Sequence, residues 1–147
     1  MVTNGAKQAI YNLFQVFLND GDEVIIPAPY WLSYPQMVRL AGAKPVFLNS
    51  SAEDGFKINI QDLKSKISPK TKFIIINSPN NPTGRVMPKE ELLQIAEVVR
   101  ENKNINILSD EIYELILKKE FKHFSLASLA PDLKERIFII NGFAKGW

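Results

Sequence analysis

The chain has 147 residues, of which 46% are hydrophobic and 23% are charged, and these fractions are typical of one globular domain that can bury a core. The net charge of +2 is too small to indicate a nucleic-acid or membrane-surface partner, and the lack of cysteine excludes disulfides, zinc–thiolate sites and cysteine catalysis. Neither a signal-peptide pattern nor an apolar run of membrane-spanning length is present, so we expect a soluble cytoplasmic protein.

Hydrophobic periodicity predicts that helices and strands alternate along the chain. The first element is a helix over residues 4–21, where apolar side chains recur at helical spacing. Further helices are expected at residues 33–42, 59–69 and 87–103, with Asn59 as an N-cap and Pro88 in a first turn. Short apolar runs predict strands at residues 23–27, 44–49, 72–77, 105–110 and 136–141.

This alternation predicts an α/β fold in a single domain over residues 1–147. We expect a mostly parallel sheet with helices on both faces, which makes three layers. In such sheets, ligands bind beyond the carboxyl ends of the strands. The residues that directly follow each strand are therefore the candidate functional residues.

Several chemically distinct side chains follow the predicted strands. Trp31 comes after the first strand, and the turn NSPNNPTG with Asn81 comes after the third. Asp110 and Tyr113 come after the fourth strand, and Lys145 comes after the fifth. Each one alone has an ordinary structural explanation, as a packing aromatic, a turn residue, a helix cap or a solvated lysine.

Together, these side chains suit a planar, anionic, aromatic cofactor that carries an aldehyde, and pyridoxal phosphate is such a molecule. A lysine forms a Schiff base with the aldehyde. A carboxylate pairs with the pyridinium nitrogen, and an aromatic side chain stacks on the ring. The first helix begins at TNGAK, where free N–H groups can accept the phosphate and Lys7 adds positive charge.

The motifs NSPNNPTG, SDEIYE and NGFAKGW, in this order, resemble class I/II aminotransferases of pyridoxal-phosphate fold type I. The stretch PAPYWLSYPQMVRLAG is similar to the prokaryotic-type aspartate aminotransferase branch. The resemblance covers essentially the whole chain. It implies transfer of an amino group between an amino acid, aspartate for preference, and a 2-oxo acid.

The resemblance also implies a role for each matching residue. Lys145 would bind the cofactor covalently and then move the substrate's α-proton. Asp110 would pair with the pyridinium nitrogen, and Tyr113 and Asn81 would hydrogen-bond the phenolic oxygen of the ring. Trp31 would stack on the ring, and both Trp31 and Asn81 would border the substrate.

Gly5, Ala6 and Lys7 would cradle the phosphate, by the same resemblance. One position departs from the family pattern, because Gly142 stands where many relatives carry a serine that contacts the phosphate. No metal ligand set is expected.

The resemblance further implies that the chain is part of a larger protein. The family's phosphate-binding arginine, its small domain and its N-terminal segment have no counterpart here. We expect five of the seven strands of the family's large domain, with residues 137–140 as an exposed edge. An exposed apolar edge can pair with another chain, so we expect association through this edge or poor solubility. The resemblance separately implies a homodimer, because the family's site lies at a dimer interface.

Two other functions stay open at this stage. Related β-lyases and cyclopropane-carboxylate synthases share these motifs, and a fragment of the fold can be non-catalytic. His123 lies in the charged stretch KKEFKHFS and is interpreted as a surface residue, neither catalyst nor metal ligand. Glu111 and Glu114 are interpreted as solvated or capping residues.

Overall fold

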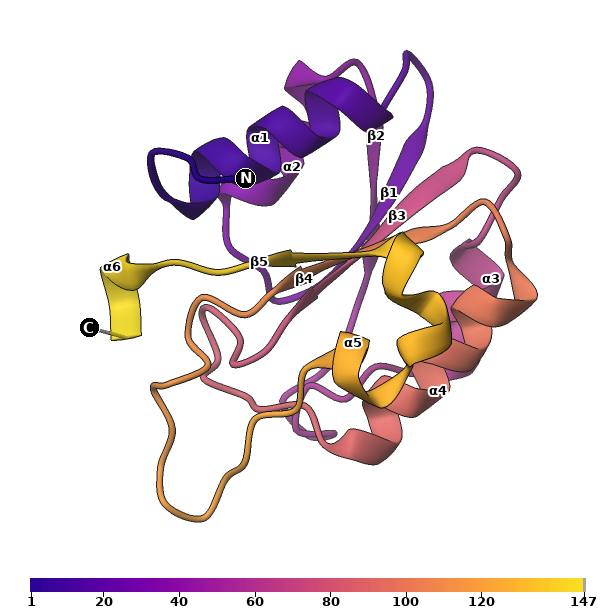
Figure 1. Cartoon of the computed structure of the whole chain (residues 1–147). Coiled ribbons are helices and arrows are strands. Elements are labelled where there is room, and N and C mark those ends of the chain that lie inside the picture. The colour runs from indigo at the N-terminus through magenta and orange to yellow at the C-terminus, as the bar shows by residue number, and fades with distance from the viewer. Residues whose placement is uncertain (147) are drawn as a thin grey trace.

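A computed structural model describes residues 1–146 and shows helices alternating with strands (Figure 1). The only residue of the predicted motifs that lies outside the described part is Trp147. In chain order the elements are α1 (Gly5–Phe17), β1 (Glu23–Pro27), α2 (Ser33–Leu40), β2 (Lys44–Leu48), α3 (Ile60–Lys66), β3 (Thr71–Asn77), α4 (Lys89–Glu101), β4 (Asn106–Asp110), α5 (Leu126–Leu129), the 3-10 helix η1 (Pro131–Arg136), β5 (Ile137–Ile140) and α6 (Phe143–Gly146).

The five strands form one parallel sheet in the order β2-β1-β3-β4-β5, which confirms the predicted fold class. All connections are therefore crossovers, and every strand ends at the same edge of the sheet. The register pairs Asn77 of β3 with Asp110 of β4, so the polar residues at these two strand ends are neighbours.

Helices cover both faces of the sheet, because the apolar side chains of the strands alternate between two cores. Val24 and Ile26 of β1 pack with α1 and α2, whereas Ile25 packs with α3, α4, α5 and η1. In β3, Phe73 and Ile75 lie on the α1 side, and Ile74 and Ile76 lie on the other. Figure 1 shows the two groups of helices on opposite sides of the strands.

The predicted helix ends are partly right. Asn59 caps α3, since its side-chain oxygen accepts the backbone N–H groups of Gln61 and Asp62 at 2.9 and 3.2 Å. The prediction that Pro88 lies inside a first turn is wrong, because its backbone is extended and α4 begins at Lys89. The short helices α5 and η1 were not predicted, because each is too short to show periodicity.

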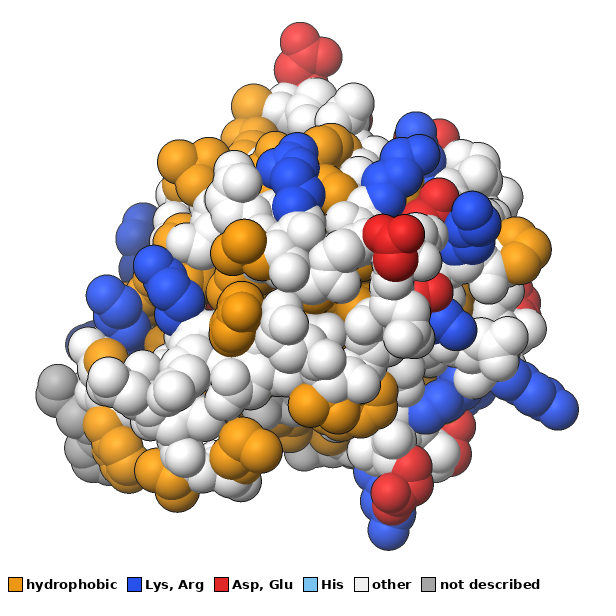
Figure 2. All heavy atoms as spheres, turned by 90° about the horizontal axis from the view of Figure 1, so that it is seen from above, with side chains coloured by type: hydrophobic (Ala, Val, Ile, Leu, Met, Phe, Trp, Pro, Cys, Tyr) orange, Lys and Arg blue, Asp and Glu red, His pale blue; other side chains and the backbone are white. Residues whose placement is uncertain are grey.

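Strand β5 lies at the edge of the sheet, as expected, and Ile139 on it is 47% exposed. Whether the chain associates through this edge stays a prediction. Seen from above, hydrophobic side chains lie on the surface among lysines and arginines (Figure 2). The exposed apolar residues include Tyr11, Val16 and Phe17 of α1. No helix in residues 1–146 is long and apolar enough to span a membrane.

Candidate active site

The ends of β3 and β4 are joined by the side chain of Asn77. Its amide nitrogen donates to the backbone carbonyl of Asp110 at 3.0 Å, and its oxygen accepts the backbone N–H of Asn81 at 2.8 Å. Asn77 is 5% exposed, so both hydrogen bonds are made away from water. The turn that carries Asn81 is thereby fixed relative to Asp110.

The carboxylate of Asp110 is buried at the end of β4, and the residue is 3% exposed. It accepts the hydroxyl of Tyr34 at 2.6 Å and the backbone N–H of Ile112 at 3.2 Å. Burial raises the pKa of Asp110, although both hydrogen bonds act in the opposite direction. Both donors are neutral, so a cationic N–H group at this carboxylate would be strongly favoured.

Tyr34 in α2 is the donor that holds Asp110 in place. Burial, followed by the nearby charge of Asp110, raises the pKa of Tyr34 well above its ordinary value of 10.0. The phenol therefore keeps its proton and remains a donor at neutral pH. Its ring meets the ring of Trp31 edge-on at 5.3 Å between centroids, which links Trp31 to the Asp110 site.

Tyr113 and Asn81 meet beside Asp110, as the sequence predicts. The amide nitrogen of Asn81 donates to the hydroxyl of Tyr113 at 3.4 Å. The turn that carries Asn81 is closed by Asn80, whose oxygen accepts the hydroxyl of Thr83 at 2.8 Å. Gly84 ends this turn with φ of +72°, a conformation that glycine adopts without strain.

The N-terminus of α1 lies next to Trp31. The ammonium of Lys7 is 5.1 Å from the centroid of the Trp31 ring, within cation–π range. Asn4 makes no side-chain cap, and the first turn holds no acidic residue. The backbone N–H groups of Gly5, Ala6 and Lys7 start a helix whose dipole favours an anion.

Lys145 lies in α6 with an exposed side chain. The segment before it is tied to the loop after β4, since Asn141 donates to the carboxylate of Glu114 at 2.6 Å. A Cβ built on Gly146 would approach Leu115 to 3.0 Å, so α6 packs closely on this loop. The structure thus brings the segment of Lys145 beside that of Tyr113.

Two residues of the site, Tyr34 and Asn77, were missed from the sequence. Asn77 could have been found from its position, because it is a polar residue that directly follows the isoleucine run of β3. A polar side chain at such a buried position needs hydrogen-bond partners. Tyr34 lies in the first turn of α2, three residues after Trp31, which precedes the helix, and no local pattern marks Tyr34 as a partner of Asp110.

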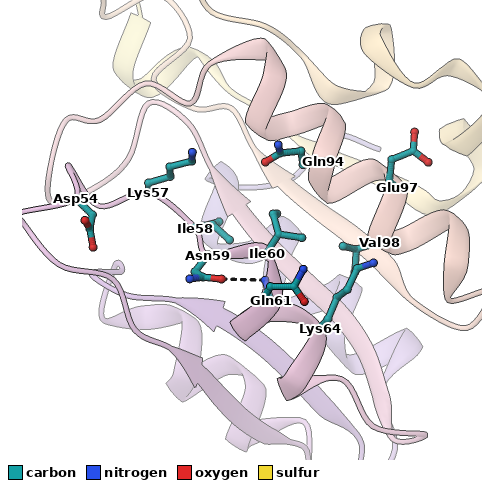
Figure 3. Close-up of a pocket in the computed structure, with 10 residues that line it drawn as sticks. All are labelled: Asp54, Lys57, Ile58, Asn59, Ile60, Gln61, Lys64, Gln94, Glu97 and Val98. Atoms are coloured by element: carbon teal, nitrogen blue, oxygen red, sulfur yellow. Dashed lines mark hydrogen bonds between the residues drawn. The ribbon is translucent and has the colours of Figure 1, made fainter.

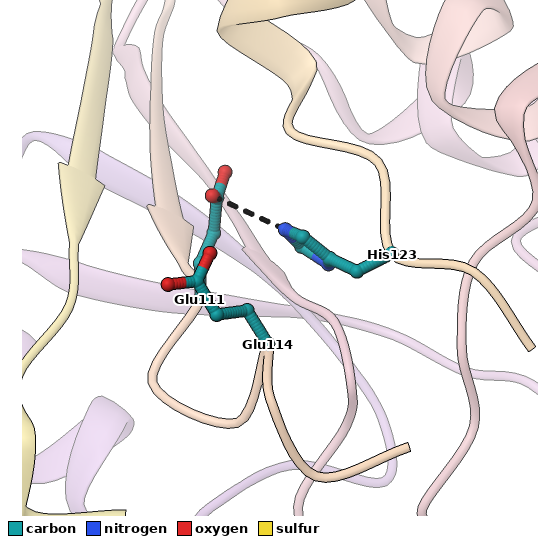
Figure 4. Close-up of side chains that lie close together, drawn as sticks. All are labelled: Glu111, Glu114 and His123. Carbon is teal, nitrogen blue, oxygen red and sulfur yellow. Dashed lines mark hydrogen bonds and ion pairs between the residues drawn. The ribbon is translucent and has the colours of Figure 1, made fainter. Parts of the chain in front are cut away.

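Two interpretations made from the sequence are wrong. His123 is not a surface residue, because its side chain is only 12% exposed and its Nε2 lies 3.2 Å from the carboxylate of Glu111. Glu111 is not solvated, since it is 3% exposed, and its carboxylate binds the side chains of Ser109, His123 and Ser125 rather than capping backbone N–H groups (Figure 4). The charged sequence around His123 gave no sign that the loop folds back on β4.

The chain also has a hollow of about 660 Å³ between the start of α3 and α4 (Figure 3). Polar and charged side chains line much of it, including Lys57, Gln61 and Glu97. None of the predicted site residues is among the lining residues. The candidate site at the strand ends is therefore a separate place.

Replacing Asp110 with asparagine should make the unliganded chain more stable at neutral pH. Because the folded-state pKa is raised, wild-type stability is fully present below the ordinary value of 3.8 and falls as pH rises through the raised pKa. Asparagine does not titrate, and the Tyr34 hydroxyl can rotate to accept a hydrogen bond from the asparagine amide. The stability advantage of the variant should thus grow with pH and then level off.

Urea unfolding of wild type and Asp110→Asn across the acid-to-neutral range measures this difference. Asp132→Asn serves as the control of opposite sign, because hydrogen bonding by Arg100 lowers the pKa of the exposed Asp132. An Asp110→Asn chain that is less stable than wild type at neutral pH would show that the charged hydrogen bond from Tyr34 outweighs the cost of burial.

The fold and the polar strand ends define an α/β domain with a candidate ligand site at the carboxyl edge of its sheet, and comparison with known proteins identifies the family. The sequence matches aminotransferase class I and II over residues 1–147, so the chain belongs to this family. It is 54% identical over 147 residues to the probable aspartate/prephenate aminotransferase of Rickettsia bellii. It is 51% identical over 152 residues to the aspartate aminotransferase of Bacillus subtilis.

Solved structures agree with this assignment. Aspartate aminotransferase from Thermus thermophilus with maleate matches 97% of the chain at TM-score 0.91 and 47% identity. Aspartate aminotransferase from Rhizobium meliloti matches 97% at TM-score 0.94 and 36% identity. The chain covers 36% of each of these structures, and 37% and 38% of the two curated relatives. It therefore spans little more than a third of the relatives' length.

Proposed function

We propose that residues 1–147 form one domain, the pyridoxal-phosphate-binding core of an aminotransferase. The reaction is transfer of an amino group between an amino acid and a 2-oxo acid, with aspartate as the preferred donor. One observation carries the proposal: a buried Asp110, held by Tyr34, lies beside the Tyr113–Asn81 pair at the strand ends. The names of the relatives support aspartate as the substrate.

The chemistry of the side chains fits pyridoxal phosphate. Asp110 has two neutral donors and a raised pKa, so a cationic ring N–H would relieve the cost of its buried charge. Tyr113 and Asn81 offer donors for a phenolic oxygen, and the start of α1 with Lys7 offers a site for a phosphate. Trp31 offers an aromatic face beside Lys7.

When bound, the cofactor supplies an aldehyde for amines and a ring that withdraws electrons from the substrate's α-carbon. Asp110 would hold a proton on the ring nitrogen, and Tyr34 keeps Asp110 oriented. Tyr113 and Asn81 would hydrogen-bond the phenolic oxygen of the ring, and Trp31 would offer it an aromatic face. Lys145 would hold the cofactor through its Nζ and would move the α-proton of the substrate.

The proposal is tested by adding pyridoxal phosphate to the chain and recording the visible absorbance of the lysine-bound form. L-aspartate should then discharge this band and release one equivalent of oxaloacetate. Pyridoxine phosphate, which lacks the aldehyde, should compete for the site without producing the band. A chain that gives no band at any concentration of pyridoxal phosphate does not have the proposed function.

A further inference from the structure

A buried hydrogen-bond network lies one residue beyond Asp110, on the opposite side of the strand. The side chain of Glu111 is 4% exposed and has three partners. It accepts the hydroxyls of Ser109 and Ser125 at 2.9 and 3.0 Å, and it lies 3.2 Å from Nε2 of His123. Figure 4 shows the imidazole pointing at the carboxylate.

The network closes a long loop onto the end of β4. Ser109 and Glu111 flank Asp110 in the sequence, whereas His123 and Ser125 lie at the far end of the loop that carries Tyr113. The backbone N–H of Glu111 also donates to the carbonyl of Ile140 in β5 at 2.8 Å. Glu111 therefore connects β4, β5 and both ends of the loop.

The hydrogen-bond partners of the two ring nitrogens indicate which neutral tautomer of His123 is favoured. Its Nδ1 is buried and has no hydrogen-bond partner within residues 1–146. A proton on Nδ1 would leave a buried donor unpaired, which is costly. The favoured tautomer therefore carries its hydrogen on Nε2 and donates it to Glu111, so three donors face this carboxylate.

The three groups Glu111, Glu114 and His123 lie close enough to suggest a cation site, with candidate ligand atoms within 4.8 Å. Both oxygens of Glu111 are already engaged, by two hydroxyls and by His123, and Oε1 of Glu114 accepts Asn141. A hydrogen-bond network describes this cluster better than a metal site does.

A buried polar network of this kind is a poor means of stabilising a fold, since apolar residues of similar size often serve as well. We propose that Glu111 and His123 are positioning residues that hold Asp110 and Tyr113 in the geometry the cofactor requires. This inference rests on the proposed function, because it concerns the same site.

The test compares His123→Leu, which removes the donor to Glu111, with His123→Gln, whose amide can replace it. His123→Leu should weaken pyridoxal-phosphate binding about tenfold or more, as loss of outer supporting residues commonly does, whereas His123→Gln should stay within about twofold of wild type. Ser125→Ala also removes one donor to Glu111 but leaves His123 and Ser109 in place and adds no bulky apolar group, so it should give a smaller loss. If the leucine variant does not fold, the pyridoxal-phosphate affinity of Ser125→Ala still tests the proposal.

A second measurement needs no cofactor. Carbon-13 NMR of the Asp110 carboxyl should show its pKa falling toward 3.8 in His123→Leu, because burial is the main cause of the raised pKa. The pKa should be retained in His123→Gln. Leu63→Ala, a core change in α3, lowers stability away from the site and should leave both binding and the Asp110 pKa unchanged.

Four results separate the possibilities. The positioning role is overturned if His123→Leu binds pyridoxal phosphate with the same affinity as wild type. It is also overturned if the leucine and glutamine variants lose equal affinity. Either result leaves the proposed function intact. Equal losses in His123→Leu and Leu63→Ala at matched stability also overturn the positioning role. Failure of wild type to bind pyridoxal phosphate overturns the proposed function itself, and is seen without any variant.

Discussion

Replacing Lys145 with alanine is expected to abolish covalent attachment of pyridoxal phosphate while leaving the fold intact. The side chain is exposed on α6, so its loss removes no buried contact. Without its amine, the release of 2-oxo acid from aspartate should fall on the order of a thousandfold or more, because proton transfer is lost together with attachment. The visible absorbance of the bound form should disappear.

Borohydride reduction followed by peptide mass mapping measures the attachment directly. In wild type, the reduced cofactor should be found on the peptide that contains Lys145. Lys118 is the matched control, since it is also an exposed lysine, in the loop after β4, and Lys118→Ala should keep the label on Lys145. If the label is spread evenly over exposed lysines and is unchanged in Lys145→Ala, pyridoxal phosphate reacts with surface lysines in general and not at a specific binding site.

The parts of this structure that follow from local pattern were predictable. The β-branched isoleucine run of β3 favours a strand covered on both faces, and the periodicity of α4 indicates its buried side. The rule that parallel strands end at one edge was enough to expect Asp110, Tyr113 and Asn81 together, and the hydrogen bonds among their segments confirm that proximity.

Residues that act through distant partners were not predictable in this way. Tyr34 and Asp110 are 76 positions apart, and nothing local to Tyr34 shows that α2 packs over the end of β4. His123 shows the same limit, because its neighbours are charged and only docking of the loop buries it. A sequence pattern reports which face of an element is apolar, but not which element covers it.

Replacing Glu91 with alanine is expected to lower the free energy of unfolding by about 3–5 kcal/mol, as breaking a buried ion pair commonly does. Its side chain is 1% exposed and pairs through both oxygens with Arg85, which is 17% exposed. Glu91 also accepts the backbone N–H of Ile58 at 3.0 Å. Alanine would leave a partly buried guanidinium and a buried N–H without their acceptor.

Chemical denaturation at neutral pH measures this loss, and Glu97→Ala is the control on the same helix. Glu97 is 64% exposed and pairs with Arg100 at the surface, so its removal should cost far less. Equal losses in the two variants would contradict the assignment of the energy to burial. Changing Arg85 and Glu91 together to leucine should recover much of the loss, because the unpaired charge is then removed.

The Glu91 variant should also affect the cofactor site, because Arg85 ends the turn that carries Asn81. The carbonyl of Arg85 accepts the backbone N–H of Asn80 at 2.8 Å, and its own N–H donates to Thr83 at 3.2 Å. A guanidinium released from Glu91 moves toward water and draws this turn with it. Affinity for pyridoxal phosphate should therefore fall in Glu91→Ala even where the chain remains folded, and stay unchanged in Glu97→Ala.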